Sequence, residues 1–143
     1  MKKIIIYTDG GSRNNPGIAG AGVFISDEKG NELKKAKKFL GIQTNNWAEY
    51  EALIIGLEKA KGLLGSEIGN TEVEVRMDSQ LIVRQINGEY RVKEPSLFQQ
   101  FVKVNNLKVN FPHIQFVHIP RAENKEADRL VNKELDTKSS VLF

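Results

Sequence analysis

Residues 4–12 read Ile-Ile-Ile-Tyr-Thr-Asp-Gly-Gly-Ser, an apolar run that ends at a carboxylate and two glycines. An unbroken apolar run of this kind is typical of a strand buried on both faces, so we expect residues 3–9 to form a central strand. Residues 10–17, rich in Gly and Asn, are expected to form a loop. Asp9 therefore ends a buried strand, where an unpaired carboxylate costs on the order of several kcal/mol or takes up a proton.

Three further acids stand where a fold rarely places a carboxylate. Asp78 ends the alternating run 73–77, and Glu49 and Asp128 lie in the first turns of two predicted helices, beside or on their apolar faces. Four converging carboxylates would repel one another, and a shared hard cation bound through oxygen relieves that repulsion. The sequence therefore predicts a divalent-metal site built from Asp9, Glu49, Asp78 and Asp128.

The composition narrows the class of protein. The 143 residues suit one domain with a single core, and 40% hydrophobic with 27% charged residues is ordinary for a globular chain. The net charge of +3 is compatible with a polyanionic partner. The absence of cysteine excludes disulfides, Cys-zinc sites and thiol catalysis. No apolar run approaches the ~18 residues that span a membrane, and the N-terminal run is too short for a signal peptide, so we expect a cytoplasmic monomer without a membrane partner.

The order of elements predicts an α/β fold. Further strands are expected at 19–26, 32–40, 72–77 and 114–119, and helices at 44–61, 79–87, 95–108 and 124–135. Short turns make the first three strands antiparallel, while intervening helices make the later strands parallel to the first. The prediction is a five-stranded mixed sheet with helices on both faces, forming one domain over 1–136 with a tail at 137–143.

Five segments, taken together and in this order, resemble the type 1 ribonuclease H family. They are Tyr7–Ser12, Asn15–Gly17, Thr44–Tyr50, Asp78–Leu81 and Asn124–Leu130. The resemblance covers residues 3 to about 135. The stretch Asn87-Gly88-Glu89-Tyr90, with Val92 and Lys93, is most similar to archaeal-type and related bacterial members. The resemblance implies an RNase H-like fold and catalytic domain.

The resemblance also implies an activity. Members are metal-dependent endoribonucleases that hydrolyse the RNA strand of RNA/DNA hybrids, leaving 5′-phosphate and 3′-hydroxyl ends. Carried over by position, Asp9 would bridge two Mg²⁺ ions, Glu49 and Asp78 would help to hold one, and Asp128 would hold the other. Mn²⁺ is a possible substitute. Two ions about 4 Å apart can activate a water and stabilise the leaving oxygen of an in-line displacement.

Substrate-binding residues follow from the same resemblance. RNA differs from DNA by its 2′-hydroxyls and by the shape of its duplex. The candidates for contact with 2′-hydroxyls and base edges are Gly11, Ser12, Asn15, Asn45 and Gln80. Thr44 is similar to the phosphate-contacting threonine at a helix start, where free N–H groups also favour phosphate. Arg121 could contact phosphate, or it could assist proton transfer or product release.

Each acid also has a purely structural interpretation. Asn46 and Glu49 have the spacing of a capping box. Asp78 could cap the helix that follows it, and Asp9 could form an Asx turn. Asp128 could be an exposed helical acid with a neighbouring lysine as its partner. Without a metal site, all four structural interpretations would have to hold at once. That coincidence favours the metal site.

The family's loop histidine has no counterpart before the last helix. Residues 119–124 contain no histidine, and His118 is expected within the last strand, in a structural role. A basic protrusion carrying tryptophans is not evident in residues 88–112 either.

Two other functions stay open: a broader nuclease that also cuts double-stranded RNA, and a non-cleaving nucleic-acid-binding module. The four acids argue against the second, because a pure binder gains nothing from repelling phosphates.

Overall fold

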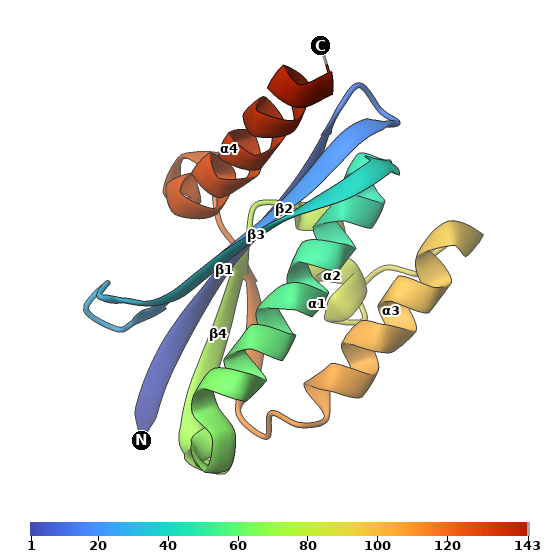
Figure 1. Cartoon of the computed structure of the whole chain (residues 1–143). Helices are drawn as coiled ribbons and strands as arrows, with labels where there is room; N and C mark the ends of the chain where they lie inside the picture. The colour runs from blue at the N-terminus through green and yellow to red at the C-terminus, as the bar shows by residue number, and fades with distance from the viewer. Residues whose placement is uncertain (143) are drawn as a thin grey trace.

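A five-stranded mixed sheet forms the centre of the computed structural model, which describes residues 1–142 (Figure 1). The strands are β1 Lys2–Arg13, β2 Gly17–Asp27, β3 Glu32–Gln43, β4 Thr71–Met77 and β5 Ile114–His118, in the spatial order β3-β2-β1-β4-β5. β2 is antiparallel to β1 and β3, whereas β4 is parallel to β1 and β5. The predicted mixed sheet is confirmed.

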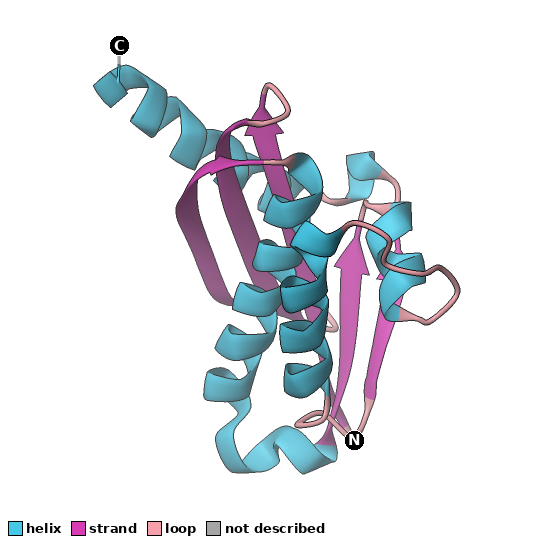
Figure 2. Cartoon of the chain, turned by 90° about the vertical axis from the view of Figure 1, so that its right-hand side faces the viewer, coloured by secondary structure: helices cyan, strands magenta, loops and turns pink. Residues whose placement is uncertain are grey.

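Helices cover both faces of this sheet, as predicted. They are α1 Asn45–Leu64, α2 Gln80–Ile86, α3 Pro95–Lys108 and α4 Lys125–Leu142, with 3-10 turns η1 Gly65–Asn70 and η2 Arg121–Glu123. Figures 1 and 2 show α1, α2 and α3 on one side and α4 alone across the other. Within residues 1–142, no helix combines the length and the apolar character needed to cross a membrane.

The main core lies between β1, β4 and helix α1. Ile4, Ile6 and Val75 of the sheet are completely buried, and so are Leu53 and Leu57 of α1. The packing of these side chains holds α1 against β1. The first turn of the helix therefore lies beside the part of β1 that contains Asp9.

The expected loop at 10–17 is wrong in its first half. Residues 10–13 continue β1 and pair with residues 18–21 of β2, which leaves only Asn14–Pro16 as the turn. Small residues face one another across this part of the ladder, with Gly10 opposite Ala21 and Gly11 opposite Gly20. The turn itself contains a cis Asn15–Pro16 bond and a positive φ of 69° at Asn14.

The last helix is longer than the sequence predicts. It was expected to end at 135, but α4 continues across residue 136 as far as Leu142. Local contacts support this extension, since the Thr137 hydroxyl donates to the Lys133 carbonyl at 2.9 Å. The Lys138 ammonium also lies 5.5 Å from the ring centre of Phe39 on β3. Of the predicted tail, Phe143 lies outside the described residues.

Candidate active site

Four elements bring the four predicted acids to one place. Asp78 directly follows β4, whose last pairing with β1 joins Met77 to Thr8, the residue before Asp9. Asp9 and Asp78 are thus neighbours where the parallel part of the sheet ends. Glu49 comes from the start of α1 and Asp128 from the start of α4. The structure therefore assembles all four acids at the edge of the sheet where α/β folds usually carry their sites.

Two glycines allow the helices to come this close. A Cβ on Gly10 would lie 2.1 Å from the Ala48 carbonyl oxygen, so only glycine lets α1 pack directly on β1 at this level. The Gly10 N–H then donates to the Glu49 carboxylate. On the other face, a Cβ on Gly22 would lie 2.3 Å from the Ala127 carbonyl oxygen, which brings the start of α4 against β2.

Other residues cap the two helices that follow the acids. The Thr44 hydroxyl accepts from the Trp47 N–H at 3.2 Å, so Thr44 is the N-cap of α1 and the capping box that would have used Glu49 is wrong. In the same way, the Ser79 hydroxyl caps α2 by accepting from the Ile82 N–H at 3.3 Å. Glu49 and Asp78 are therefore not used as helix caps.

The remaining structural interpretations do not hold either. Asp9 lies within the paired part of β1, opposite Gly22, and not in an Asx turn. Asp128 accepts from Arg121 Nη2 at 3.3 Å, and Arg121 precedes the helix. The carboxyl groups of Asp9 and Asp128 also share a hydrogen bond, which places both side chains in the same site.

Three of the carboxylates crowd one another, and two of these, Asp9 and Glu49, are buried. One oxygen each of Asp9, Glu49 and Asp78 lies within 4.8 Å of the others. Burial first, and then the charges of Asp78 and Asp128, raise the pKa of Asp9 to about 8. Burial and the charge of Asp9 likewise raise the pKa of Glu49 well above its usual range. Crowding of this kind at neutral pH is what a bound cation would relieve.

An unpaired oxygen indicates where such a cation would bind. Glu49 Oε2 is buried and has no hydrogen-bond partner among residues 1–142. A buried carboxylate oxygen without a partner is costly unless it has a ligand. The donors are all carboxylate oxygens, which are the ligands that Mg²⁺ and Mn²⁺ prefer. The residues present therefore fit a hard divalent ion.

Asn124 supports the site in a way that the sequence did not reveal. Its side chain is completely buried, and Nδ2 donates both to the Thr8 carbonyl at 2.9 Å and to Asp78 Oδ2 at 3.1 Å. One amide thus joins β1, the end of β4 and the start of α4. The only available signal was its place at the head of the segment 124–130, immediately before the helix.

A groove of about 360 Å³ opens over the carboxylates and is called the acidic groove below. Its lining includes the four acids, Gly10, Gly11, Ser12, Arg13, Asn45, Arg121, Val131, Asn132 and Leu135. Arg121 stands at the mouth with 80% of its side chain exposed. Arg121 lowers the pKa values of Asp9 and Glu49, but burial and the neighbouring acids outweigh it.

Several predicted substrate residues form one hydrogen-bonded rim. Asn45 Oδ1 accepts from the Ser12 N–H at 2.8 Å and from the Ser12 hydroxyl at 3.1 Å. Asn15 Oδ1 in turn accepts from the Asn45 N–H at 3.0 Å. Gly11 lines the groove itself. Gln80 is exposed at the first turn of α2 and lies outside the lining of the groove.

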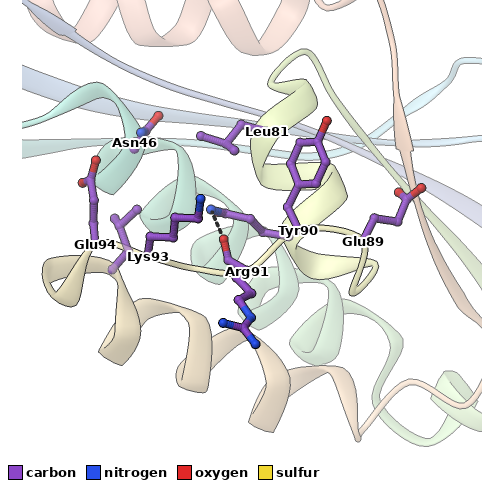
Figure 3. A pocket seen from close by; sticks show the side chains of 9 residues that line it. Asn46, Leu81, Glu89, Tyr90, Arg91, Lys93 and Glu94 are labelled. Atoms are coloured by element: carbon purple, nitrogen blue, oxygen red, sulfur yellow. Dashed lines mark hydrogen bonds between the residues drawn. The ribbon is translucent and has the colours of Figure 1, made fainter.

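A second, larger hollow of about 480 Å³ lies beside the start of α1 (Figure 3). Its lining includes Asn46 and, in the segment 89–94, every residue except Val92. Tyr90 of this segment is 47% exposed. The Arg84 guanidinium lies 5.2 Å from the centre of the Tyr90 ring. Buried Gln85 holds the segment by donating to the Arg91 carbonyl at 3.3 Å, the dashed line in Figure 3.

The same glutamine connects the second hollow to α1. Gln85 Oε1 accepts from the hydroxyl of buried Tyr50 at 2.7 Å, and Tyr50 directly follows Glu49. The position of the segment 89–94 is therefore coupled to α1. Sequence reasoning missed this arrangement because it depends on contacts between distant parts of the chain.

His118 lies where the sequence predicts, at the end of β5 and opposite Met77. Its side chain is exposed and does not contribute to the acidic groove.

Known proteins share this arrangement of elements. The family described as "Reverse transcriptase-like" matches residues 7–134. LC11-RNase H1, solved in complex with an RNA/DNA hybrid, is 54% identical with a TM-score of 0.90, over 94% of this chain and 98% of that one. Ribonuclease HI of the archaeon Halobacterium salinarum is 37% identical over 94% of this chain and 65% of its own length. The bifunctional protein Rv2228c of Mycobacterium tuberculosis is 42% identical, but the chain spans only 36% of its length.

LC11-RNase H1 matches this chain over nearly its full length at more than half identity, and the archaeal relative supports the same assignment. The chain belongs to the type 1 ribonuclease H family.

Proposed function

We propose that this chain is an endoribonuclease that hydrolyses the RNA strand of RNA/DNA hybrids to 5′-phosphate and 3′-hydroxyl ends. The observation that carries the proposal is the cluster of Asp9, Glu49 and Asp78, with oxygens within 4.8 Å of one another in an open groove. The hybrid bound by LC11-RNase H1 supports the choice of substrate. A monomeric, cytoplasmic protein is part of the same proposal.

The cluster would hold two Mg²⁺ ions, or Mn²⁺ in their place. Asp9 would contact both ions, Glu49 and Asp78 would share one, and Asp128 would hold the other. Ions bound there would supply the Lewis acidity that activates the attacking water and stabilises the leaving 3′ oxygen. The unpartnered Glu49 Oε2 and the raised pKa of Asp9 support this assignment.

The chain itself positions these ligands. Asn124 holds Asp78 through its Nδ2, and the Gly10 N–H holds Glu49. Arg121 reaches the mouth of the groove beside Asp128. A guanidinium offers five donors and no acceptor, so Arg121 would serve as a phosphate ligand and not as a base.

The rim would recognise the RNA strand. Because Ser12 occupies the Oδ1 of Asn45, the amide nitrogen of Asn45 is directed away from that bond and can donate to a 2′-hydroxyl or base edge. Asn15 Oδ1 accepts from the backbone N–H of Asn45 and so fixes the backbone at this position. Thr44 Oγ1 accepts from Trp47, which leaves the hydroxyl proton of Thr44 to donate to a phosphate at the start of α1.

The second hollow would receive the DNA strand. Asn45 lines the acidic groove and the next residue, Asn46, lines the second hollow, so one duplex across the start of α1 reaches both. Tyr90 offers an aromatic face to sugars or bases, and Lys93 offers a charge to phosphates. Gln80, at the first turn of α2, would contact the minor groove between them.

Cleavage of labelled duplexes tests this function. RNA/DNA, RNA/RNA and DNA/DNA duplexes of one sequence are incubated with Mg²⁺, Mn²⁺ or EDTA, using the wild type and Asp9→Asn. We expect cutting of the RNA strand of the hybrid, 5′-phosphates on the products, and a loss of about 10³-fold or more in EDTA and in Asp9→Asn. Full activity in EDTA would refute the metal site. Equal cutting of RNA/RNA would identify a broader nuclease, and binding without cutting would identify a binding module.

A further inference from the structure

The acidic groove continues beyond the carboxylates, along β1. Even-numbered residues of this strand face α1: Thr8 meets Gly56, and Ser12 bonds to Asn45. Asp9, Gly11 and Arg13 therefore share the opposite face, toward α4, and all three line the groove. Arg13 lies four residue steps along the strand from Asp9, a path of roughly 13 Å.

Arg13 stands at the far end of this path. Its guanidinium pairs with Asp136 of α4, and their side chains are 39% and 69% exposed. An ion pair as exposed as this contributes about 0–1 kcal/mol, so stabilising the fold does not by itself explain an arginine there. A guanidinium carries five donors in a rigid fork, which can serve Asp136 and a second anion together.

The strand between the carboxylates and Arg13 borders the groove at Gly11. Among the described residues, a Cβ on Gly11 would meet no atom within 4 Å, so this stretch of the strand has room beside it. The groove is therefore an acidic centre with one arginine at its mouth, Arg121, and another at its far end, Arg13. The phosphates of a nucleic-acid strand follow one another in a row. Arg121, the carboxylates with their cation and Arg13 could therefore each meet a phosphate of one strand.

We propose that Arg13 binds a phosphate of the RNA strand that is separate from the phosphate being cut, on the α4 side of the groove. The proposal rests on the proposed function, because the strand is placed by the carboxylates. Arg13 is a positioning residue: it lies too far from Asp9 to touch the reacting atoms. Its contact forms when the strand binds and does not change during the reaction, so its loss raises KM and leaves kcat nearly unchanged.

The chain offers a matched control on the same helix. Lys37 of β3 pairs with Glu134 of α4 at 3.0 Å, with side chains 34% and 14% exposed. Neither residue lines the acidic groove. Lys37→Ala removes the same charge and a comparable ion pair to α4, but outside the groove.

Hybrids carrying one uncharged methylphosphonate at each RNA position in turn provide the test. We expect Arg13→Ala to raise KM about tenfold and to lower the slope of log affinity against log salt by about 0.7–0.9, with kcat within twofold. Arg13→Lys should recover part of the KM. Lys37→Ala should stay within about twofold of the wild type in both parameters.

The position of the sensitive phosphate decides the proposal. The wild type should lose affinity when the methylphosphonate stands at one position offset from the cut. At that position, and at no other, Arg13→Ala should bind the modified and the unmodified hybrid equally well. An unchanged KM, or equal sensitivity of both proteins at every position, would overturn the proposal. Binding is also measured by fluorescence anisotropy in EDTA with the same hybrids. A wild type that binds but does not cut would refute the proposed function, and the affinities of wild type and Arg13→Ala would still decide the role of Arg13.

Discussion

Asn124 holds the carboxylate of Asp78 through a hydrogen bond of 3.1 Å from Nδ2 to Oδ2. The same nitrogen donates to the Thr8 carbonyl, although the Asn124 side chain has no contact with solvent. One buried amide thus connects a proposed metal ligand, the central strand and the start of the last helix.

Asn124→Ala should therefore weaken both fold and activity. The change leaves the buried Thr8 carbonyl without this donor, and we expect a loss of about 2–3 kcal/mol in the free energy of unfolding, measured in urea. Activity on hybrid should fall about tenfold or more as Asp78 loses its orientation. Asn132→Ala, which removes an exposed 3.4 Å contact to Asp128, is the control and should change stability little. Equal stability of the two variants would contradict the role of Asn124.

The stability of the metal-free protein should fall as pH rises. Burial and the neighbouring acids raise the pKa of Asp9 from 3.8 to about 8. Between these two values the folded chain holds a proton that the unfolded chain has lost, so the free energy of unfolding decreases with pH across that window. Mg²⁺ should reverse the trend at high pH, because it binds the ionised carboxylate. Urea denaturation in EDTA at pH 5, 6.5 and 8 checks this, and Asp9→Asn should flatten the profile. A stability that rises with pH in EDTA would count against the crowded site.

Gly10→Ala and Gly11→Ala should behave differently although they are neighbours. A Cβ on Gly10 would lie 2.1 Å from the Ala48 carbonyl oxygen, so α1 must move, at a cost of about 1–3 kcal/mol or more. Glu49 moves with the helix, and the rise in melting temperature on adding Mg²⁺ should shrink. A Cβ on Gly11 meets no atom of the described residues within 4 Å, so Gly11→Ala should keep both stability and the response to Mg²⁺. Similar melting curves for the two variants would show that α1 is not held by this contact.

His118→Ala should have a small effect, within about threefold in kcat/KM, since its exposed side chain lies outside the acidic groove. Arg121→Ala should lower kcat/KM by about tenfold or more, because it removes a cation at the mouth of the groove. Steady-state kinetics on one hybrid compares the two variants. A thousand-fold loss in His118→Ala would place the histidine in the reaction after all.

Tyr90→Ala should raise the KM for hybrid severalfold, because stacking on an aromatic ring contributes about 1–3 kcal/mol per base. The ring is 47% exposed, so the melting temperature should hardly change. Phe98→Ala, which removes a 46% exposed ring on α3 outside the second hollow, is the control. A KM that rises equally in both variants would argue against a strand-binding role for the hollow.

Local patterns were enough to predict the strands, the mixed sheet and the four acids. Each acid follows a buried run or begins an amphipathic helix, and such signals lie within a few residues of one another. The extension of β1 through Arg13 was missed because glycines read as a loop, and only their pairing with small residues of β2 makes them a strand. The contacts of Asn124 with Thr8 and of Arg13 with Asp136 were also missed, since both join segments more than 100 positions apart.

The acids come from positions 9, 49, 78 and 128, so no short stretch of the chain contains the site. During synthesis, the first three can meet only after β4 has paired with β1, and the fourth arrives with the last helix. A nascent chain therefore cannot form the complete proposed metal site before the sequence up to Asp128 has been translated. Because the proposed ligands are scattered along the chain, the metal site can exist only once the sheet, α1 and the start of α4 are assembled together.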